Sequence, residues 1–438
     1  MGHLGHMKEE YRDLIERLDQ GQVGLPEPED ERAVRGRQEI LEILYEPEEA
    51  AIAARMPSRP SKLKKVAERV GMAPERLKPK LDAMCDKGLV MDLVHPDTGE
   101  VRYFLSPPVV GFFEFSLMRA NDGIPKKRIA EALRDYTHYD ASFAKEVFGH
   151  DTVVGRALTR EAHIVDDALP DVLDWEKATA IIEASSTQSV SLCYCRHKAE
   201  HLGEQCDAPQ ETCLSLNAGA EFVIRRGFGR QIEKAEALQI LADSRKAGLV
   251  QIADNVRNRP TYICNCCGCC CGQLQAINEY GLAAVNPSGF EPQLTDDKCA
   301  GCPLCSQACP ISAISMVGHR VTGKRKNTLR PEVDREICIG CGVCAEACRK
   351  GALHMARTEN QPYVPASAVE KAIRMAIERG RLAHLLVDQT ESRGHKFLNQ
   401  VLNTLVNLPV AARLLASEQV QSRFVREALK RVKDPTGG

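Results

Sequence analysis

Two copies of one cysteine spacing constrain the fold of this 438-residue chain more than any other feature. The stretches CAGCPLCSQAC (299–309) and CIGCGVCAEAC (338–348) both have the form C-x2-C-x2-C-x3-C. Three thiols this close together can wrap one face of a metal core, and the fourth starts a short helix that points away from that face. A zinc ribbon would have two C-x2-C pairs and no third cysteine at this spacing. The two runs therefore predict two metal centres that are larger than a single zinc ion.

These runs resemble the dicluster domain of bacterial ferredoxins over about residues 291–357. The resemblance implies two 4Fe-4S clusters, and the fourth cysteine of each run is expected to ligate the cluster of the other run. Gly301, Gly340 and Gly342 are expected to let backbone amides approach the cluster sulfides. The second run departs from the family, because Arg349 stands where proline is usual, whereas the first run keeps Pro310. The implied ligand sets are Cys299, Cys302, Cys305 and Cys348 for the first cluster, and Cys338, Cys341, Cys344 and Cys309 for the second.

Ten further cysteines lie upstream in two groups. The first group is Cys193, Cys195, Cys206 and Cys213, and the second is Cys264, Cys266, Cys267, Cys269, Cys270 and Cys271. Adjacent residues of an extended segment point to opposite sides, and Gly268 can reverse the chain. We therefore expect the second group to face two metal centres, one of which the first group completes. Ten thiols would fill two sites of four and leave two spare.

Two other interpretations of these ten cysteines stay open. One is a structural zinc site. The other rests on the sequence CCG, which occurs at 266–268 and 270–272 and resembles the motif of heterodisulfide-reductase-type subunits, which hold a non-cubane cluster at an active site. That family separates its two motifs and adds flanking cysteines, and this chain does not.

The front of the chain lacks clustered cysteines. Residues 36–106 combine a helix–turn–helix pattern with two short strands around HPDTGE (95–100), which is similar to a winged helix. We predict a multidomain α+β chain, mainly helical, with an N-terminal winged helix, a cysteine-rich cluster domain and a ferredoxin-like dicluster domain. The predicted segments are 1–35 (N-terminal segment), 36–106 (winged-helix-like), 107–185 (helical bridge), 186–290 (cysteine-rich), 291–357 (dicluster) and 358–438 (helical basic tail).

Clustered cysteines and the lack of an N-terminal apolar run argue for metal thiolates in a reducing, cytoplasmic environment rather than for secreted disulfides. No run of about 18 apolar residues predicts a membrane span. Residues 393–433 carry eight Lys or Arg against two Glu, a pattern that suits peripheral contact with an acidic membrane surface or, as we favour, a helical cover for the dicluster domain. The G-x-G of RRGFGR (225–230) does not follow an apolar strand, so neither flavin nor nicotinamide is expected in this chain.

The leading functional hypothesis is an iron–sulfur electron-transfer protein with two 4Fe-4S clusters and one or two more upstream. Its arrangement is similar to 4Fe-4S proteins of anaerobes with a winged-helix-like front. It would relay electrons between a low-potential carrier and a redox partner protein, which would be a ferredoxin, a flavoprotein or an oxidoreductase subunit. One alternative is a redox-sensing regulator whose winged helix binds DNA, although docking to protein is favoured. Another is a cluster-based reductase, an oxidoreductase with its active centre at the 264–271 loop. No catalytic residue can be singled out.

Overall fold

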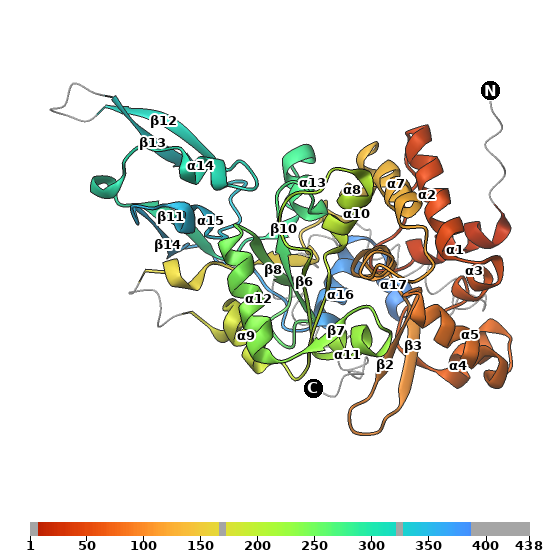
Figure 1. The fold of residues 1–438 in the computed structure, drawn as a ribbon. Helices are drawn as coiled ribbons and strands as arrows, with labels where there is room; N and C mark the ends of the chain where they lie inside the picture. Colours follow the sequence, from red (N-terminus) through yellow and green to blue (C-terminus); the bar gives the residue numbers. More distant parts are fainter. Residues whose placement is uncertain (1–7, 166–171, 321–326, 387–438) are drawn as a thin grey trace, which may run out of the picture. The chain divides into compact units, whose positions relative to one another are not determined.

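The computed structural model of the chain describes residues 8–165, 172–320 and 327–386. The chain forms two compact units (Figure 1). The first comprises Met1–Thr152, Arg225–Phe228 and Ser367–Gly438, and the second comprises Val153–Ile224 and Gly229–Ala366. The predicted basic helices at 393–433 lie outside the described residues. Within the described part of the chain, none of the helices has the length and apolar character that crossing a membrane requires.

The first unit is helical with one small antiparallel sheet in the order β1-β3-β2. Its strands are β1 (Ser61–Lys62), β2 (Val90–Val94) and β3 (Val101–Leu105). Its helices are α1 (Glu9–Asp19), α2 (Glu31–Leu44), α3 (Pro47–Ala53), α4 (Leu63–Val70), α5 (Pro74–Asp86), α6 (Phe113–Phe115), α7 (Lys126–His138), α8 (Ser142–Phe148), α16 (Ala368–Glu378) and α17 (Leu382–Leu386).

Several predicted elements of this unit are present. Helices α4 and α5 are separated by a turn in which Gly71 adopts a positive φ, and β2 pairs with β3 across the predicted turn. Strand β1 was not predicted, and α2 runs across the predicted segment boundary at residue 35. Cys85 is a free thiol that is fully buried on α5. The winged-helix assignment itself stays a prediction.

The second unit is built on a seven-stranded sheet in the order β10-β4-β8-β9-β6-β5-β7. Neighbouring strands are antiparallel except for β10 and β4, which are parallel. The strands are β4 (Gly155–Ala157), β5 (Gln188–Leu192), β6 (Glu211–Leu216), β7 (Arg230–Ile232), β8 (Val250–Asp254), β9 (Tyr262–Cys266) and β10 (Val285–Asn286). The helices that accompany this sheet are α9 (Ala178–Ala184), α10 (Tyr194–Leu202), α11 (Asn217–Arg225), α12 (Lys234–Lys246) and α13 (Gly272–Tyr280). The sheet corrects the prediction of a mainly helical chain, because the fold is mixed α/β.

One side of this sheet is an apolar core. Val190, Leu214 and Ile263 from three adjacent strands pack with apolar residues of α9 and α12, including Ile182 and Leu241. Because side chains alternate along a strand, the residues between them point to the opposite face. These intervening residues include cysteines and serines, so the sheet separates an apolar layer from a thiol-bearing layer.

The dicluster region follows the sheet in the chain. Two-stranded antiparallel sheets join β11 (Phe290–Leu294) to β14 (Leu353–Arg357) and β12 (Ile314–Arg320) to β13 (Asn327–Val333). The short helices α14 (Leu304–Ala308) and α15 (Val343–Ala347) each end directly before the last cysteine of a run, so the prediction that this cysteine starts a helix is wrong. Cys305 and Cys344 belong to the same buried cluster as Phe290, Ile314 and Met355. The thiols of this region therefore form part of its core.

Candidate metal centres

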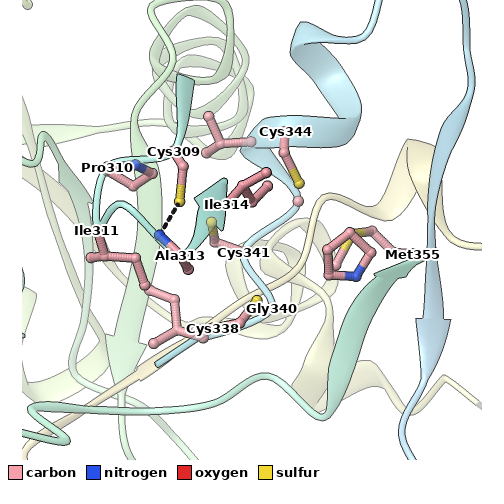
Figure 2. Close-up of a pocket in the computed structure, with 14 residues that line it drawn as sticks. Cys309, Pro310, Ile311, Ala313, Ile314, Cys338, Gly340, Cys341, Cys344 and Met355 are labelled. Carbon is pink, nitrogen blue, oxygen red and sulfur yellow. Dashed lines mark hydrogen bonds between the residues drawn. The ribbon is translucent and has the colours of Figure 1, made fainter. Parts of the chain in front are cut away.

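All nineteen cysteines are free thiols. Four of them, Cys309, Cys338, Cys341 and Cys344, line one pocket, which Figure 2 shows from close by. This is the set that the sequence assigned to the second cluster, and it combines the three close cysteines of the second run with the last cysteine of the first. Apolar groups including Ile311, Ile314 and Met355 complete the lining. Four thiols around an apolar hollow fit a 4Fe-4S cluster, which binds four thiolates and is shielded from water. We call this place the cluster II site.

The last cysteine of each run has the same backbone environment. The Ala313 amide donates to Cys309 Sγ at 3.2 Å, and the Ala352 amide donates to Cys348 Sγ at 3.3 Å. Burial opposes ionisation at Cys348, but several backbone amides outweigh it and hold the pKa of this thiol below its ordinary value. The two halves of the region thus repeat one another at the level of single hydrogen bonds.

Glycines shape the tight turns of both runs. Gly301, Gly340 and Gly342 all have φ between 68° and 78°, where a side chain would be strained. A Cβ on Gly340 would lie 2.1 Å from the Phe290 carbonyl oxygen, and one on Gly342 would lie 3.1 Å from Arg160. Glycine was predicted at these positions because backbone amides must approach the cluster sulfides. The structure gives a different reason, because a side chain there would collide with protein atoms.

The predicted ligands of the first cluster differ widely in exposure. Cys305 is buried, Cys299 and Cys348 are half-buried, and Cys302 is exposed. We call this place the cluster I site. Its exposed thiol makes it the side of the dicluster region that solvent and partner molecules can reach.

Arg160 is a buried cation beside the cluster II site. Its guanidinium donates to the carbonyl oxygens of Arg245 and Leu249 at 2.9 and 3.2 Å and pairs with Glu346 at 3.2 Å. It also lowers the pKa of Cys341, although burial is stronger and raises that pKa to about 12. Since a metal ligand must be a thiolate, iron binding here has to displace protons from buried thiols.

A second constellation lies in the cysteine-rich region. Cys206, Cys267, Cys269 and Cys270 place their sulfur atoms within 4.8 Å of one another. The Sγ atoms of Cys206 and Cys267, and those of Cys269 and Cys270, are 3.7 Å apart, and Cys270 lies 4.0 Å from Cys206. Four thiolates around one tetrahedral ion at a bond length of about 2.3 Å lie about 3.8 Å apart. This four-thiol site therefore has the dimensions of a centre with a single ion of iron or zinc.

The other six upstream thiols form a separate group. Electrostatic interactions make them neighbours of one another in the order Cys193, Cys195, Cys271, Cys266, Cys264 and Cys213. We call them the six-thiol group. The ten upstream cysteines thus divide into four and six, whereas the sequence predicted two sites of four with two spare thiols.

Arg196 lies between the two upstream groups and is completely buried. Its guanidinium donates to the Asn265 carbonyl oxygen at 2.9 Å, contacts Thr212 Oγ1 and lies 4.0 Å from Cys267 Sγ. Hydrogen bonds from Cys270, opposed by burial and aided by Arg196, lower the pKa of Cys267 to about 4. A buried cation next to thiols stabilises their ionised, metal-binding form.

Sequence reasoning missed both arginines. Arg196 stands inside the CYCRH stretch, so its position beside two cysteines was a usable signal. Arg160 lies far from every cysteine run in the sequence, and only the fold brings it to the cluster II site.

Gly268 of the cysteine loop (residues 264–271) contacts the dicluster region. A Cβ on Gly268 would lie 2.4 Å from the carbonyl oxygen of Pro310, so only glycine fits at this contact. The Asn278 amide group donates to the same oxygen at 3.1 Å. Pro310 directly follows the cluster II ligand Cys309, and Gly268 stands between Cys267 and Cys269 of the four-thiol site. The two sites are therefore joined through a close backbone contact.

Comparison with protein families agrees with the geometry of the dicluster region. The family model described as a 4Fe-4S dicluster domain matches residues 298–352, which contain all eight predicted ligands. Comparison with curated proteins and with solved structures gives no match to the chain. The chain therefore contains a 4Fe-4S dicluster domain, and the cysteine-rich region that precedes it lies outside the matched residues.

Proposed function

We propose that the chain is an electron-transfer protein whose dicluster domain exchanges electrons with a metal centre at the cysteine loop. The two 4Fe-4S clusters and a thiolate-bound iron would each take up and release one electron at a time. The protein supplies thiolates, shields the sites from water and sets the contacts between them. The acceptor or donor outside the chain would be a redox partner protein in a reducing compartment such as the cytoplasm.

The contact between Gly268 and Pro310 carries this proposal. It brings the backbone that follows Cys309 against the backbone between Cys267 and Cys269, with no room for a side chain between them. Asn278 fixes the same carbonyl oxygen by a hydrogen bond. Such a contact favours electron exchange, because a continuous path of backbone bonds with a single van der Waals contact connects the ligands of the two sites.

The exposed Cys302 indicates where an external carrier would dock. The three other ligands of the cluster I site are at least partly covered, so this thiol marks the most accessible edge of the dicluster region. We infer that electrons enter or leave through cluster I and pass through cluster II to the cysteine loop.

Contacts at α5 support protein docking rather than DNA binding by the first unit. The lysines on this helix and at its C-terminal end each pair with a carboxylate of the same unit: Lys78 with Asp82 at 2.6 Å, Lys80 with Glu48 at 2.7 Å and Lys87 with Glu49 at 2.8 Å. A helix that binds DNA needs unengaged cations for the phosphates and Arg, Asn or Gln for the base edges, and α5 offers only the exposed Arg76 for the second role.

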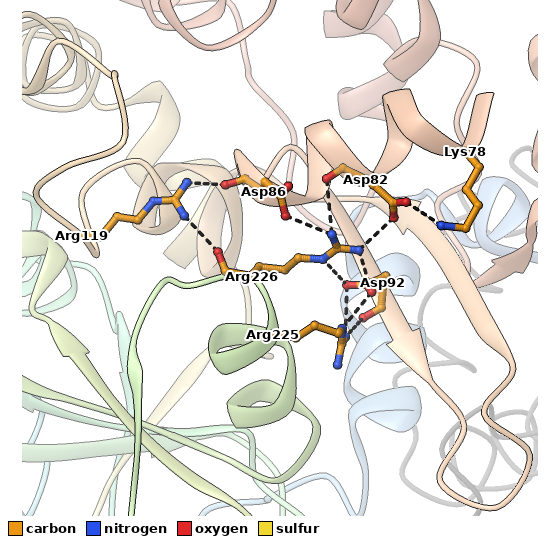
Figure 3. A network of polar contacts seen from close by, with 7 residues as sticks. All are labelled: Lys78, Asp82, Asp86, Asp92, Arg119, Arg225 and Arg226. Carbon is orange, nitrogen blue, oxygen red and sulfur yellow. Dashed lines mark hydrogen bonds and ion pairs between the residues drawn. The ribbon is translucent and has the colours of Figure 1, made fainter. Parts of the chain in front are cut away.

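An arginine network occupies the acidic side of α5 (Figure 3). Arg226 pairs with Asp82, Asp86 and the buried Asp92 at 3.2, 3.0 and 3.0 Å, and Arg225 pairs with Asp92 at 3.0 Å. The short segment Arg225–Phe228 is thus held firmly against α5 and β2. This arrangement gives α5 a structural partner within the unit, which fits a scaffold or docking role.

The test compares alanine substitutions at Gly268, in the cysteine loop, and at Gly272, the first residue of α13. In Gly268→Ala, the new methyl group must push the loop away from Pro310, whereas a methyl group at Gly272 would have no atom within 4 Å, so Gly272→Ala should be accommodated. Freeze-quench EPR after rapid mixing with a low-potential reductant would follow the order in which the centres become reduced. We expect several-fold slower equilibration between the dicluster and the loop centre in Gly268→Ala, with metal content equal to that of Gly272→Ala.

Equal equilibration rates in the two variants would contradict the proposed route. Loss of metal in Gly268→Ala alone would show that the glycine maintains the four-thiol site, and the route would then be tested with Asn278→Ala, which removes only the hydrogen bond to Pro310. An unchanged rate in Asn278→Ala as well would overturn the proposal.

A further inference from the structure

We propose that the six-thiol group holds a further polynuclear iron–sulfide cluster, separate from the dicluster and from the four-thiol site. The ligands are Cys193, Cys195, Cys213, Cys264, Cys266 and Cys271. This inference adds a centre to the proposed relay, and it rests on geometry that the relay does not need.

Strand register gathers the first part of this group. Leu214 pairs with Ile263, so Cys213 stands directly opposite Cys264 on the neighbouring strand. Cys266 follows two residues after Cys264 on the same face. Ser191 pairs with Cys213, and β5 ends at Leu192 after a register shift, with Cys193 as the next residue. One face of β6 and β9 therefore carries three thiols, and Cys193 lies just beyond the end of β5.

Two helix starts supply the remaining thiols. Cys195 lies in the first turn of α10, and Cys271 is the residue that immediately precedes α13. Both helices have nine residues, and the N-terminal end of a helix interacts favourably with negative charge. Cys195 and Cys271 thus stand where a helix start favours a negatively charged, metal-binding thiolate.

Spacing separates this group from a mononuclear site. Thiolates of one tetrahedral ion lie about 3.8 Å apart, so any three of them would fall within 4.8 Å of one another. Among the residues that the structure describes, only the four-thiol site meets that limit. No three of the six thiols are that close together, so a core of several irons fits their open arrangement better than a single ion does. A pair of zinc ions would again bring four sulfurs around each ion and does not fit this spacing.

Unpaired hydroxyls on the same face point to a ligand. Ser189 and Ser191 are at most 4% exposed, and within the described part of the chain their hydroxyl oxygens have no hydrogen-bond partner. Ser191 stands opposite Cys213 in the strand register. A buried hydroxyl without a partner is unfavourable, and a cluster sulfide would accept its hydrogen bond. The buried guanidinium of Arg196 next to Cys193 and Cys266 would balance the negative charge of the cluster.

The first test counts inorganic sulfide in anaerobically purified protein. The dicluster contributes about eight irons and about eight sulfides per chain, and the four-thiol site adds one metal ion and no sulfide. We expect clearly more than eight sulfides. About eight sulfides, with or without zinc, would overturn the inference and leave the proposed function intact, whereas a complete absence of sulfide would remove both.

The second test assigns the excess to named thiols. The double variant Cys213→Ser, Cys264→Ser removes the facing pair on the sheet, and Cys85→Ala is the matched control, since Cys85 is a buried free thiol of the other unit. We expect sulfide to fall to the dicluster value in the double variant, with the EPR signals of the dicluster retained, and to stay unchanged in the control. Unchanged sulfide in the double variant would overturn the inference, and the count in the unmodified protein decides the matter even if the double variant fails to fold.

Discussion

The dicluster region and the cysteine-rich region assemble their thiols in different ways. In the dicluster region, three ligands of each cluster come from one run of seven residues, and the fourth comes from the other run. In the cysteine-rich region, the thiols come from two neighbouring strands, two helix starts and two loops. The first arrangement depends on local backbone turns, and the second depends on strand register across a large sheet.

This difference has a physical consequence. A one-residue slip between β6 and β9 would turn Cys264 and Cys266 toward the apolar side of the sheet, whereas no such slip exists for a compact run. The sheet must therefore be correctly paired before the six-thiol group exists. The dicluster ligands come together once the tight turns within each run have formed and the two runs have packed against each other.

Ionisation in the metal-free protein should differ most between the two regions. The pKa of Cys341 is raised to about 12 by burial, and that of Cys267 is lowered to about 4. Below its raised pKa, Cys341 is a neutral thiol whose reactive fraction grows with pH, whereas Cys267 is already ionised above about pH 5. After chelation of the metals, we expect alkylation of Cys341 to accelerate about tenfold per pH unit between about pH 6 and 9, and that of Cys267 to change little.

Peptide mapping by mass spectrometry at timed intervals measures both rates in one sample. Parallel pH profiles for the two residues would contradict the contrast in their surroundings. A difference in accessibility between the two cysteines changes the absolute alkylation rate of each. It does not change how steeply that rate depends on pH, which is the quantity compared.

Single ligand changes should remove different amounts of iron and sulfide. Cys341→Ser is expected to lose one cubane, which is about four irons and four sulfides, while Cys267→Ser is expected to lose about one metal ion and no sulfide. Iron, zinc and labile-sulfide analysis of both variants checks this, with Cys85→Ala as the reference. Loss of several sulfides in Cys267→Ser would mean that the four-thiol site belongs to a larger cluster.

A smaller effect is expected from the buried cation beside the cluster II site. Arg160→Gln removes a positive charge next to Cys341, so the reduced and more negative form of cluster II loses stabilisation. Its potential should fall by on the order of 50 mV. Arg335→Gln removes the same charge from an exposed pair with Glu291 and should change the potential far less. Equal shifts in the two variants by redox titration would show that burial of Arg160 has no special effect.

The sequence was sufficient for the dicluster region because its information is local. The resemblance to bacterial ferredoxins assigned Cys309 to the second run's cluster, and the pocket around Cys338, Cys341 and Cys344 includes it. Helices α4 and α5 and strands β2 and β3 were also predictable, since Gly71, Pro74 and the HPDTGE turn mark their ends.

The sheet of the second unit was not predicted, although part of its signal is present. The stretches SVSL (189–192) and CLSL (213–216) alternate apolar with small polar residues, as strands with two different faces do. Clustered cysteines obscured this period, because they were assigned to loops around metal. The division into four and six thiols, and the place of Arg160, follow from pairing between distant strands and segments, which no single stretch encodes.

An anaerobic redox titration followed by EPR shows most directly whether both cysteine regions hold redox-active iron. We expect reversible one-electron reduction of two interacting 4Fe-4S clusters, together with at least one further iron centre whose signal depends on the upstream cysteines. Protein that contains zinc, lacks labile sulfide and gives no paramagnetic species on reduction would contradict it.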